Sequence, residues 1–214
     1  MTRWVLLLLV MVGAVGCVGA RAEQTSPDLA LLDVRKVAPQ VVVDLRYATA
    51  ENFTGKVLYP KSARCYLRRD VAEALLAVDK ALRAEGLGLK VFDCYRPRRV
   101  QFLLWEIVAD ERYVADPKKG SRHNRGAAVD LTLVNQAGQE LVMPTPFDDF
   151  TEKAHRSYEA LPEEAKRNRH KLQAAMQAAG FVGLATEWWH FDHQGWQRYP
   201  MSDISFEALA QPAR

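Results

Sequence analysis

One carboxylate inside an apolar strand constrains this chain more than any other feature of its sequence. Ala127–Val134 reads AAVDLTLV, a run of aliphatic and β-branched residues that predicts a buried strand. Asp130 lies in the middle of this run. Burying a carboxylate without a partner is costly, so a metal ion or a cationic group has to accompany it. The sequence therefore predicts a polar site at this strand.

The surrounding pattern predicts a mixed order of strands and helices. Further strands are expected at residues 41–47, 89–95, 140–143, 181–184 and 188–191. Helices are expected at residues 71–85 with Asp70 as N-cap, from Pro97 to about residue 109, and from Pro162 to Gly180. Because two strands meet at a hairpin while helices separate others, we expect a compact α+β domain with a mostly antiparallel sheet flanked by helices.

The first 22 residues have the pattern of an export signal. Arg3 precedes the apolar run Trp4–Val12, and Ala20-Arg21-Ala22 fits the small-residue rule for signal peptidase. The run is too short to span a bilayer as a helix. We interpret residues 1–22 as a signal peptide and residues 23–214 as one domain. Lipidation at Cys17, after a loose lipobox, remains the alternative.

Composition excludes one large class of partner. The 214 residues carry 29 basic and 26 acidic side chains, and removal of residues 1–22 takes away two arginines and leaves a net charge of about +1. A nucleic-acid binder would show a basic stripe, so we expect no nucleic-acid partner. No later run is apolar enough for a membrane span. Oligomeric state is left open.

Two cysteines remain after the signal peptide, Cys65 and Cys94. An even pair in an exported protein favours a disulfide, whereas the alternative is two small buried apolar side chains. Neither cysteine has metal-binding spacing.

Two further polar clusters lie where predicted strands meet loops, at Asp93–Pro97 and at Glu187–His190. Together, His123, Asp130 and His190 supply two imidazoles and one carboxylate. Three such ligands leave one coordination position for water, which is typical of a catalytic zinc site, whereas structural zinc more often uses cysteines. We therefore expect one zinc ion per chain.

Glu187 is the candidate base for the water that such a metal would hold. On a regular strand, residues three apart point to opposite faces. Glu187 must therefore lie on the loop before the strand, or on a bulge, to face the same site as His190. By the same rule His193 is expected to be no ligand.

Taken in this order, the clusters resemble the D-alanyl-D-alanine dipeptidase family of zinc peptidases, over about residues 31–200. The matching motifs are S-x-H-x-x-G-x-A-x-D at 121–130, E-W-W-H at 187–190, D-x-Y-R-P at 93–97, and shorter segments at 44–49, 52–55 and 147–148. One position departs from the family pattern: Pro144, not glycine, follows Met143. We expect this to alter the loop that delivers Asp148.

The resemblance implies a role for each matching residue. The implied zinc ligands are His123, Asp130 and His190, and the implied general base is Glu187. Arg96 is implied to stabilise the negative oxygen at the scissile carbonyl. The free ammonium group of the substrate is implied to bind Ser121 and Asp148, with Tyr47 lining the same pocket.

The resemblance thus predicts zinc-dependent hydrolysis of D-alanyl-D-alanine and similar unblocked D-dipeptides, in turnover of cell-wall peptides. A D,D-carboxypeptidase acting on longer peptidoglycan peptides and a non-catalytic zinc-bearing wall-binding module remain alternatives. The signal peptide predicts a periplasmic or secreted protein, which favours recycling over antibiotic resistance as its role.

Overall fold

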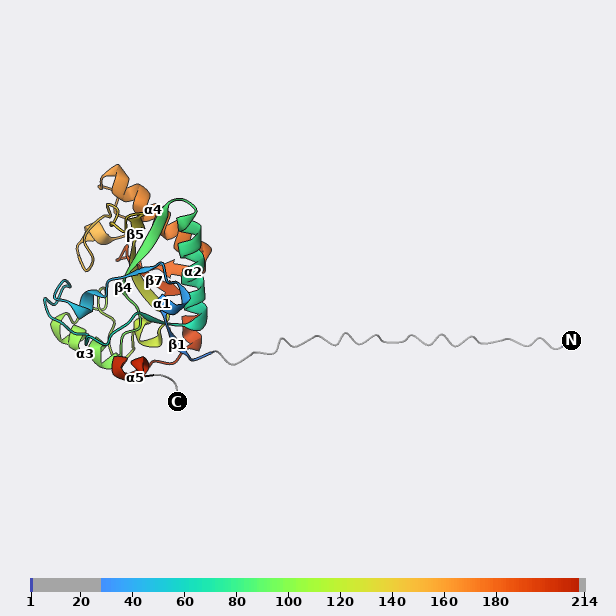
Figure 1. Cartoon of the computed structure of the whole chain (residues 1–214), viewed down its shortest axis with the longest axis vertical. Coiled ribbons are helices and arrows are strands. Elements are labelled where there is room, and N and C mark those ends of the chain that lie inside the picture. Colours follow the sequence, from blue (N-terminus) through green and yellow to red (C-terminus); the bar gives the residue numbers. More distant parts are fainter. Residues whose placement is uncertain (2–27, 212–214) are drawn as a thin grey trace.

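The computed structural model describes Met1 and residues 28–211, so the rest of the predicted signal peptide, Cys17 included, lies outside the described residues. The centre of the domain is a five-stranded sheet in the order β2-β4-β5-β7-β6 (Figure 1). Its strands are β2 (Val42–Val43), β4 (Leu87–Asp93), β5 (Ala128–Asn135), β6 (Phe181–Gly183) and β7 (His190–His193). Only β2 and β4 pair in parallel; the other pairs are antiparallel. The predicted α+β domain with a mostly antiparallel sheet is confirmed.

Helices surround this sheet, and a small second sheet lies beside it. The helices are α1 (Val34–Val37), α2 (Arg69–Arg83), α3 (Arg98–Ile107), α4 (Glu163–Ala178) and α5 (Phe206–Ala210). Figure 1 shows α2 running along one side of the sheet, with α3 and α5 at one end. The second sheet pairs β1 (Leu31–Asp33) with β3 (Tyr66–Arg68). In the described part of the chain no helix is long and apolar enough to cross a bilayer.

Helix α2 shows how the predicted periodicity becomes core. Four apolar side chains, spaced three or four apart from Val71 to Leu82, are all buried. The predicted N-cap is wrong, because the helix begins at Arg69 and Arg68 is the capping residue. Asp70 instead lies in the first turn, where its carboxylate accepts a hydrogen bond from Tyr199 near the C-terminus.

Two predicted strands are shorter than expected. The strand predicted at 41–47 is reduced to β2, because the chain then turns into a 3-10 helix (Arg46–Ala48) that brings the Tyr47 side chain into the interior. The strand predicted at 140–143 contributes only one bridge, between Val134 and Glu140. After this bridge only the Leu141 N–H still bonds β5, at the Leu133 carbonyl oxygen, and the chain then leaves the sheet.

Strand β7 begins two residues later than predicted, at His190 and not at Trp188. Trp188 and Trp189 precede it and are buried. Glu187 therefore lies on the loop between β6 and β7, as its expected partnership with His190 required.

Candidate metal centre and cleft

Strand register brings three polar side chains into one row across the sheet. Asp93 on β4 pairs with Asp130 on β5, and Asp130 pairs with His190 on β7. The register of β4 shifts between Val91 and Asp93, a local irregularity of the bulge kind that re-aims a side chain. Residues directly opposite each other on neighbouring strands have adjacent side chains. The sheet therefore delivers the carboxylate and one imidazole of the predicted ligand set.

The third predicted ligand, His123, lies on a 3-10 helix (His123–Arg125) just before β5. Gly126 ends this helix with φ +68°, and a Cβ at Gly126 would meet the Leu31 side chain at 2.4 Å. The buried side chain of Asn124 ties the turn to the segment after β4, because its amide donates to the Arg96 carbonyl oxygen at 2.9 Å. Gly126 and the hydrogen bond from Asn124 therefore both fix the position of His123.

The ligand atoms of His123, Asp130 and His190 converge, and all lie within 4.8 Å of one another. His123 Nε2 is 3.4 Å from Asp130 Oδ2 and 3.2 Å from His190 Nδ1, and His190 Nδ1 is 2.9 Å from Asp130 Oδ1. A tetrahedral zinc ion with bonds of about 2.0–2.2 Å needs its ligand atoms roughly 3.3–3.6 Å apart. The three side chains therefore fit one such ion.

The remaining ring nitrogens also fit a metal centre. His123 Nδ1 lies 2.7 Å from the Cys94 carbonyl oxygen, and His190 Nε2 lies 3.0 Å from Asp192 Oδ1. Metal-binding histidines usually donate the other ring N–H to such an acceptor, which fixes tautomer and orientation. Although burial acts to raise it, the pKa of Asp130 is lowered by His123 and His190, so this carboxylate is ionised.

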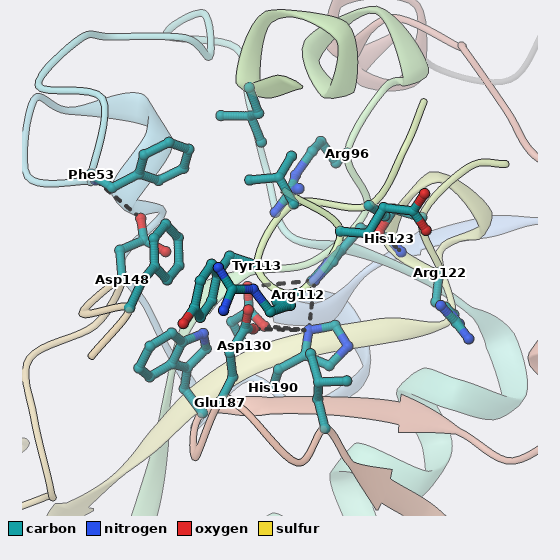
Figure 2. Close-up of a pocket in the computed structure, with 18 of the residues that line it drawn as sticks. Phe53, Arg96, Arg112, Tyr113, Arg122, His123, Asp130, Asp148, Glu187 and His190 are labelled. Carbon is teal, nitrogen blue, oxygen red and sulfur yellow. Dashed lines mark hydrogen bonds and ion pairs between the residues drawn. The ribbon is translucent and has the colours of Figure 1, made fainter. Parts of the chain in front are cut away.

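Glu187 faces the same centre from the β6–β7 loop (Figure 2). Its carboxylate is 4.0 Å from His190 Nδ1 and its residue is only 5% exposed. Burial raises the pKa of Glu187 to about 8, with His190 opposing and the carboxylates of Asp130 and Asp148 adding to the rise. A buried carboxyl with a raised pKa beside a metal centre is suited to accept and return a proton near neutral pH.

Arg96 projects into the cleft after β4 and is held rigidly. Its Nε and Nη2 donate to Asp93 Oδ2 at 3.0 and 2.6 Å, and Nη1 donates to Gln101 at 2.8 Å. The Tyr59 hydroxyl donates to the second oxygen of Asp93 at 2.7 Å. Burial acts to lower the pKa of Arg96, but Asp93 raises it well above its ordinary value. The guanidinium is therefore a permanent, fixed positive charge.

The far part of the cleft is formed by Asp148 and its partners. Asp148 Oδ1 accepts from the Tyr47 hydroxyl at 3.3 Å, and Oδ2 accepts from the Phe53 N–H at 3.2 Å. Asp148 has φ +62° and is the one non-glycine residue with positive φ in the described chain. Such backbone strain is found preferentially where a side chain must be aimed for function. The loop thus delivers Asp148 to the cleft although Pro144 replaces the usual glycine.

The electrostatics of Asp148 differ from those of the candidate ligand Asp130. Burial raises its pKa to about 7, the Phe53 N–H opposes the rise, and Asp130 adds to it. Arg96 also lowers this pKa, but among the described residues 28–211 Asp148 forms no salt bridge, so a ligand's ammonium group would give it an ion-pair partner. Ser121 lines the same pocket, with its Oγ accepting from the His123 N–H at 3.2 Å. Figure 2 shows Asp148 and Phe53 across the pocket from His123.

The two remaining predicted residues form a bond next to the strands that carry the site. Cys65 precedes β3 and Cys94 follows β4, and the structure joins them by a disulfide with Cα atoms 5.2 Å apart. His193 is no part of the cluster, as expected; its Nδ1 accepts from the Gly195 N–H. Formation of the disulfide in the exported protein stays a prediction.

Sequence reasoning missed two supporting residues. Asp192, which binds the rear of His190, follows it by two positions on β7, and residues two apart on a strand share a face. That spacing could have identified it. Gln101 carried no such signal, because its link to Arg96 depends on how α3 packs.

Two histidines and a carboxylate around one metal position, with a buried carboxyl group and a fixed arginine beside them, define a mononuclear metallohydrolase. The comparisons with known proteins identify the family. Residues 28–208 match the Peptidase M15 family, described as D-ala-D-ala dipeptidase. The chain therefore belongs to the D-Ala-D-Ala dipeptidase family of metallopeptidases, and the resemblance inferred from the motifs is confirmed.

Curated relatives cover most of both chains. The chain is 39% identical to the D-alanyl-D-alanine dipeptidase of Escherichia coli (strain K12), over 85% of its own length and 94% of that protein. It is 31% identical to the D-alanyl-D-alanine dipeptidase of Enterococcus faecium, over 76% and 90% of the two lengths. Among solved structures it is similar to the LdcB LD-carboxypeptidase, with 19% identity, a TM-score of 0.47, and coverage of 81% and 72%.

Proposed function

We propose that this protein hydrolyses D-alanyl-D-alanine and similar unblocked D-dipeptides with one zinc ion. The observation that carries the proposal is the pairing of two unlike sites in one cleft. The candidate metal ligands and Glu187 lie on one side, and Asp148, a carboxylate that forms no salt bridge within the described part of the chain, lies on the other. The first suits cleavage of a peptide bond and the second suits an ammonium group.

His123, Asp130 and His190 would hold the zinc ion. When bound, zinc supplies a Lewis acid that lowers the pKa of a water molecule toward about 7 and polarises a carbonyl oxygen. Zinc is favoured over harder cations because two of the three ligands are imidazole nitrogens.

Glu187 would accept the proton of the attacking water and pass it to the leaving amine. Its position beside His190 and its raised pKa both suit this exchange. Arg96 would stabilise the negative charge that develops on the scissile carbonyl oxygen. Because Asp93 and Gln101 already fix the guanidinium, no reorganisation is needed as that charge develops.

Asp148 and Ser121 would bind the substrate's free ammonium group, with Tyr47 completing the pocket wall. Without a ligand, burial keeps the pKa of Asp148 high; an ammonium group bound beside it would restore the charged form. A substrate without a free amine would leave this carboxylate unpaired. The arrangement therefore favours a dipeptidase over a D,D-carboxypeptidase that accepts longer peptides.

A non-catalytic wall-binding module is the second candidate. Glu187 and Arg96 argue against it, because simple binding requires neither a proton acceptor nor a fixed cation at the scissile carbonyl. A module of this kind would bind wall peptides and leave them intact.

For its place in the cell we propose export to the periplasm or outside the cell, on the strength of the 1–22 pattern. Recycling of wall-derived D-alanine fits that location. N-terminal sequencing of the exported protein tests the proposal: a start at Glu23 supports the signal peptide, a lipidated Cys17 would replace it with a lipoprotein anchor, and an intact N-terminus in the cytoplasm would contradict both.

The activity is tested by D-alanine release from D-alanyl-D-alanine, measured with metal analysis on the same sample. We expect about one zinc ion per chain, release that stops with a chelator, and recovery on adding zinc. His123→Ala should lose the metal and the activity together. Full zinc content in that variant would contradict the ligand assignment.

A further inference from the structure

Glu187 lies on a segment without regular secondary structure, yet its function requires a fixed position. Residues 184–189 connect β6 to β7. Within this segment, few backbone bonds hold the chain: the Leu184 N–H donates to the His190 carbonyl oxygen, and the Glu187 N–H donates to that of Leu184 at a long 3.4 Å. Something outside the segment must therefore hold it.

Single hydrogen bonds join residues 186–189 to the Leu131 N–H, the Thr145 hydroxyl and the Arg112 carbonyl group, and the Arg156 side chain contributes three, more than any other residue. Arg156 follows a 3-10 helix (Glu152–Ala154) and is 28 residues or more away from the segment in sequence. Its Nε donates to the Leu184 carbonyl oxygen at 2.8 Å, and its Nη2 donates to those of Trp188 and His190 at 2.9 and 2.8 Å. These acceptors flank Glu187 on both sides in sequence.

Two further contacts fix Arg156 in place. Its own N–H donates to the Ala185 carbonyl oxygen at 2.9 Å, and its guanidinium lies 4.2 Å from the centre of the Phe191 ring. Burial and the neighbouring Arg169 lower the pKa of Arg156 to about 10, while Glu187 acts in the opposite direction. The guanidinium therefore remains charged at neutral pH.

The sequence makes room for this guanidinium at one position. A Cβ on Gly183, the last residue of β6, would lie 2.3 Å from Arg156 Cζ and Nε. Gly183 has no positive φ that would itself demand glycine. The close approach of Arg156 accounts for glycine at this position.

We propose that Arg156 is a positioning residue, which holds the 184–190 segment by three carbonyl oxygens and thereby sets the place of Glu187 relative to His190. The proposal rests on the proposed function, in which Glu187 is the proton acceptor. Arg156 does not line the cleft. It acts through the backbone, because its hydrogen bonds go to carbonyl oxygens and not to the Glu187 side chain.

Guanidinium geometry is essential to this role. An arginine presents several N–H donors in a rigid plane, whereas a lysine ammonium is a compact charge that cannot reach three separated acceptors in the same way. Arg156→Lys therefore keeps the charge and removes the set of hydrogen bonds to three carbonyl oxygens. Gly183→Ala displaces the Arg156 guanidinium without changing its charge or its N–H donors.

The test compares these two variants with two matched controls in the full, zinc-loaded protein. Gln173→Ala removes a 3.4 Å contact to the same guanidinium but none of the carbonyl bonds. Val182→Ala changes an exposed residue next to Gly183 on the same strand. Measured for each are kcat and KM on D-alanyl-D-alanine, zinc content, and hydrogen exchange of the amides in residues 184–190.

We expect Arg156→Lys and Gly183→Ala to lower kcat about 100-fold, because a misplacement of about 1 Å in a catalytic group has effects of that size. KM should stay within about threefold and zinc should be retained, since the ammonium pocket and the ligand rings are untouched. Exchange in residues 184–190 should accelerate in these two variants and not in the controls.

Two results would overturn the proposal. One is kcat within about threefold of the controls together with unchanged exchange in residues 184–190. The other is loss of zinc in parallel with loss of activity, which would make Arg156 a residue for metal retention. If the wild-type protein released no D-alanine, the proposed function would fail, and the exchange measurement would still decide whether Arg156 holds the segment.

Discussion

The two sides of the cleft are built on different kinds of structure. On the metal side, Asp130 and His190 occupy paired positions on neighbouring strands, and their place is fixed by sheet register. On the amine side, Asp148 lies on an irregular loop with a strained backbone, held by Tyr47 and the Phe53 N–H. Under the proposed function, the difference teaches that the chemistry would depend on the sheet, whereas selection of the substrate would depend on a loop.

The largest effect is expected on the metal side, from Glu187→Gln. This change keeps the shape of the side chain and removes its ability to accept a proton. We expect kcat to fall by about 10²–10⁴-fold, the range of general acid–base catalysis, with zinc content unchanged. Steady-state kinetics and metal analysis on one preparation check this. A variant that kept most of its kcat would show that another group activates the water.

A smaller effect is expected on the amine side, from Asp148→Asn. Asparagine tolerates the same positive φ, so the loop should keep its shape. Loss of the charge should lower kcat/KM on the free dipeptide by about 100-fold or more at pH 8, since partners of buried charge pairs contribute several kcal/mol. Because the pKa of Asp148 is about 7, the wild-type advantage should shrink as pH falls below 7 and the carboxylate becomes protonated. A ratio of wild type to variant that stayed constant from pH 5.5 to 8 would rule out this role.

The same substitution, which is expected to lower activity, should raise the stability of the folded protein at pH 8. The folded-state pKa of Asp148 is raised from 3.8 to about 7, so the folded protein binds the proton more tightly than the unfolded chain. The ionised carboxylate therefore destabilises the fold increasingly as pH rises from about 4 to 7, by less than about 4 kcal/mol at 1.36 kcal/mol per pKa unit. Asp148→Asn should unfold at a higher temperature than wild type at pH 8, and the two should converge near pH 4. Thermal unfolding at the two pH values measures the difference.

The smallest effect on activity is expected from the disulfide next to the strands that carry the site. Opening the Cys65–Cys94 link, which spans 29 positions, should lower the free energy of unfolding by roughly 3–4 kcal/mol in the chain-entropy model. A Cys65→Ala, Cys94→Ala double variant should then melt about 10 °C lower and keep kcat within a few fold at 25 °C. Mass spectrometry of non-reduced peptides from exported wild-type protein gives the matching control. Two free thiols there would contradict the bond.

The sequence predicted the residues of the metal side more completely than the residues that hold them in place. Asp130 stood out because a carboxylate in an apolar strand needs a partner, and the order of motifs brought His123 and His190 to it. Arg156 and Gln101 carried no comparable signal, because what they hold is set by tertiary packing of loops and helices. For the same reason the sequence overestimated the strand at 41–47, where the chain turns to bring Tyr47 inward.

The measurement that tests the account most directly is a side-by-side assay of three substrates at equal concentration. These are D-alanyl-D-alanine, its N-acetyl form, and a cell-wall pentapeptide that ends in the same dipeptide. If the metal side cleaves and Asp148 selects a free amine, the free dipeptide should exceed both others in kcat/KM by roughly a thousandfold, which corresponds to about 4 kcal/mol. Comparable rates on all three would mean an open carboxypeptidase cleft and would contradict the account.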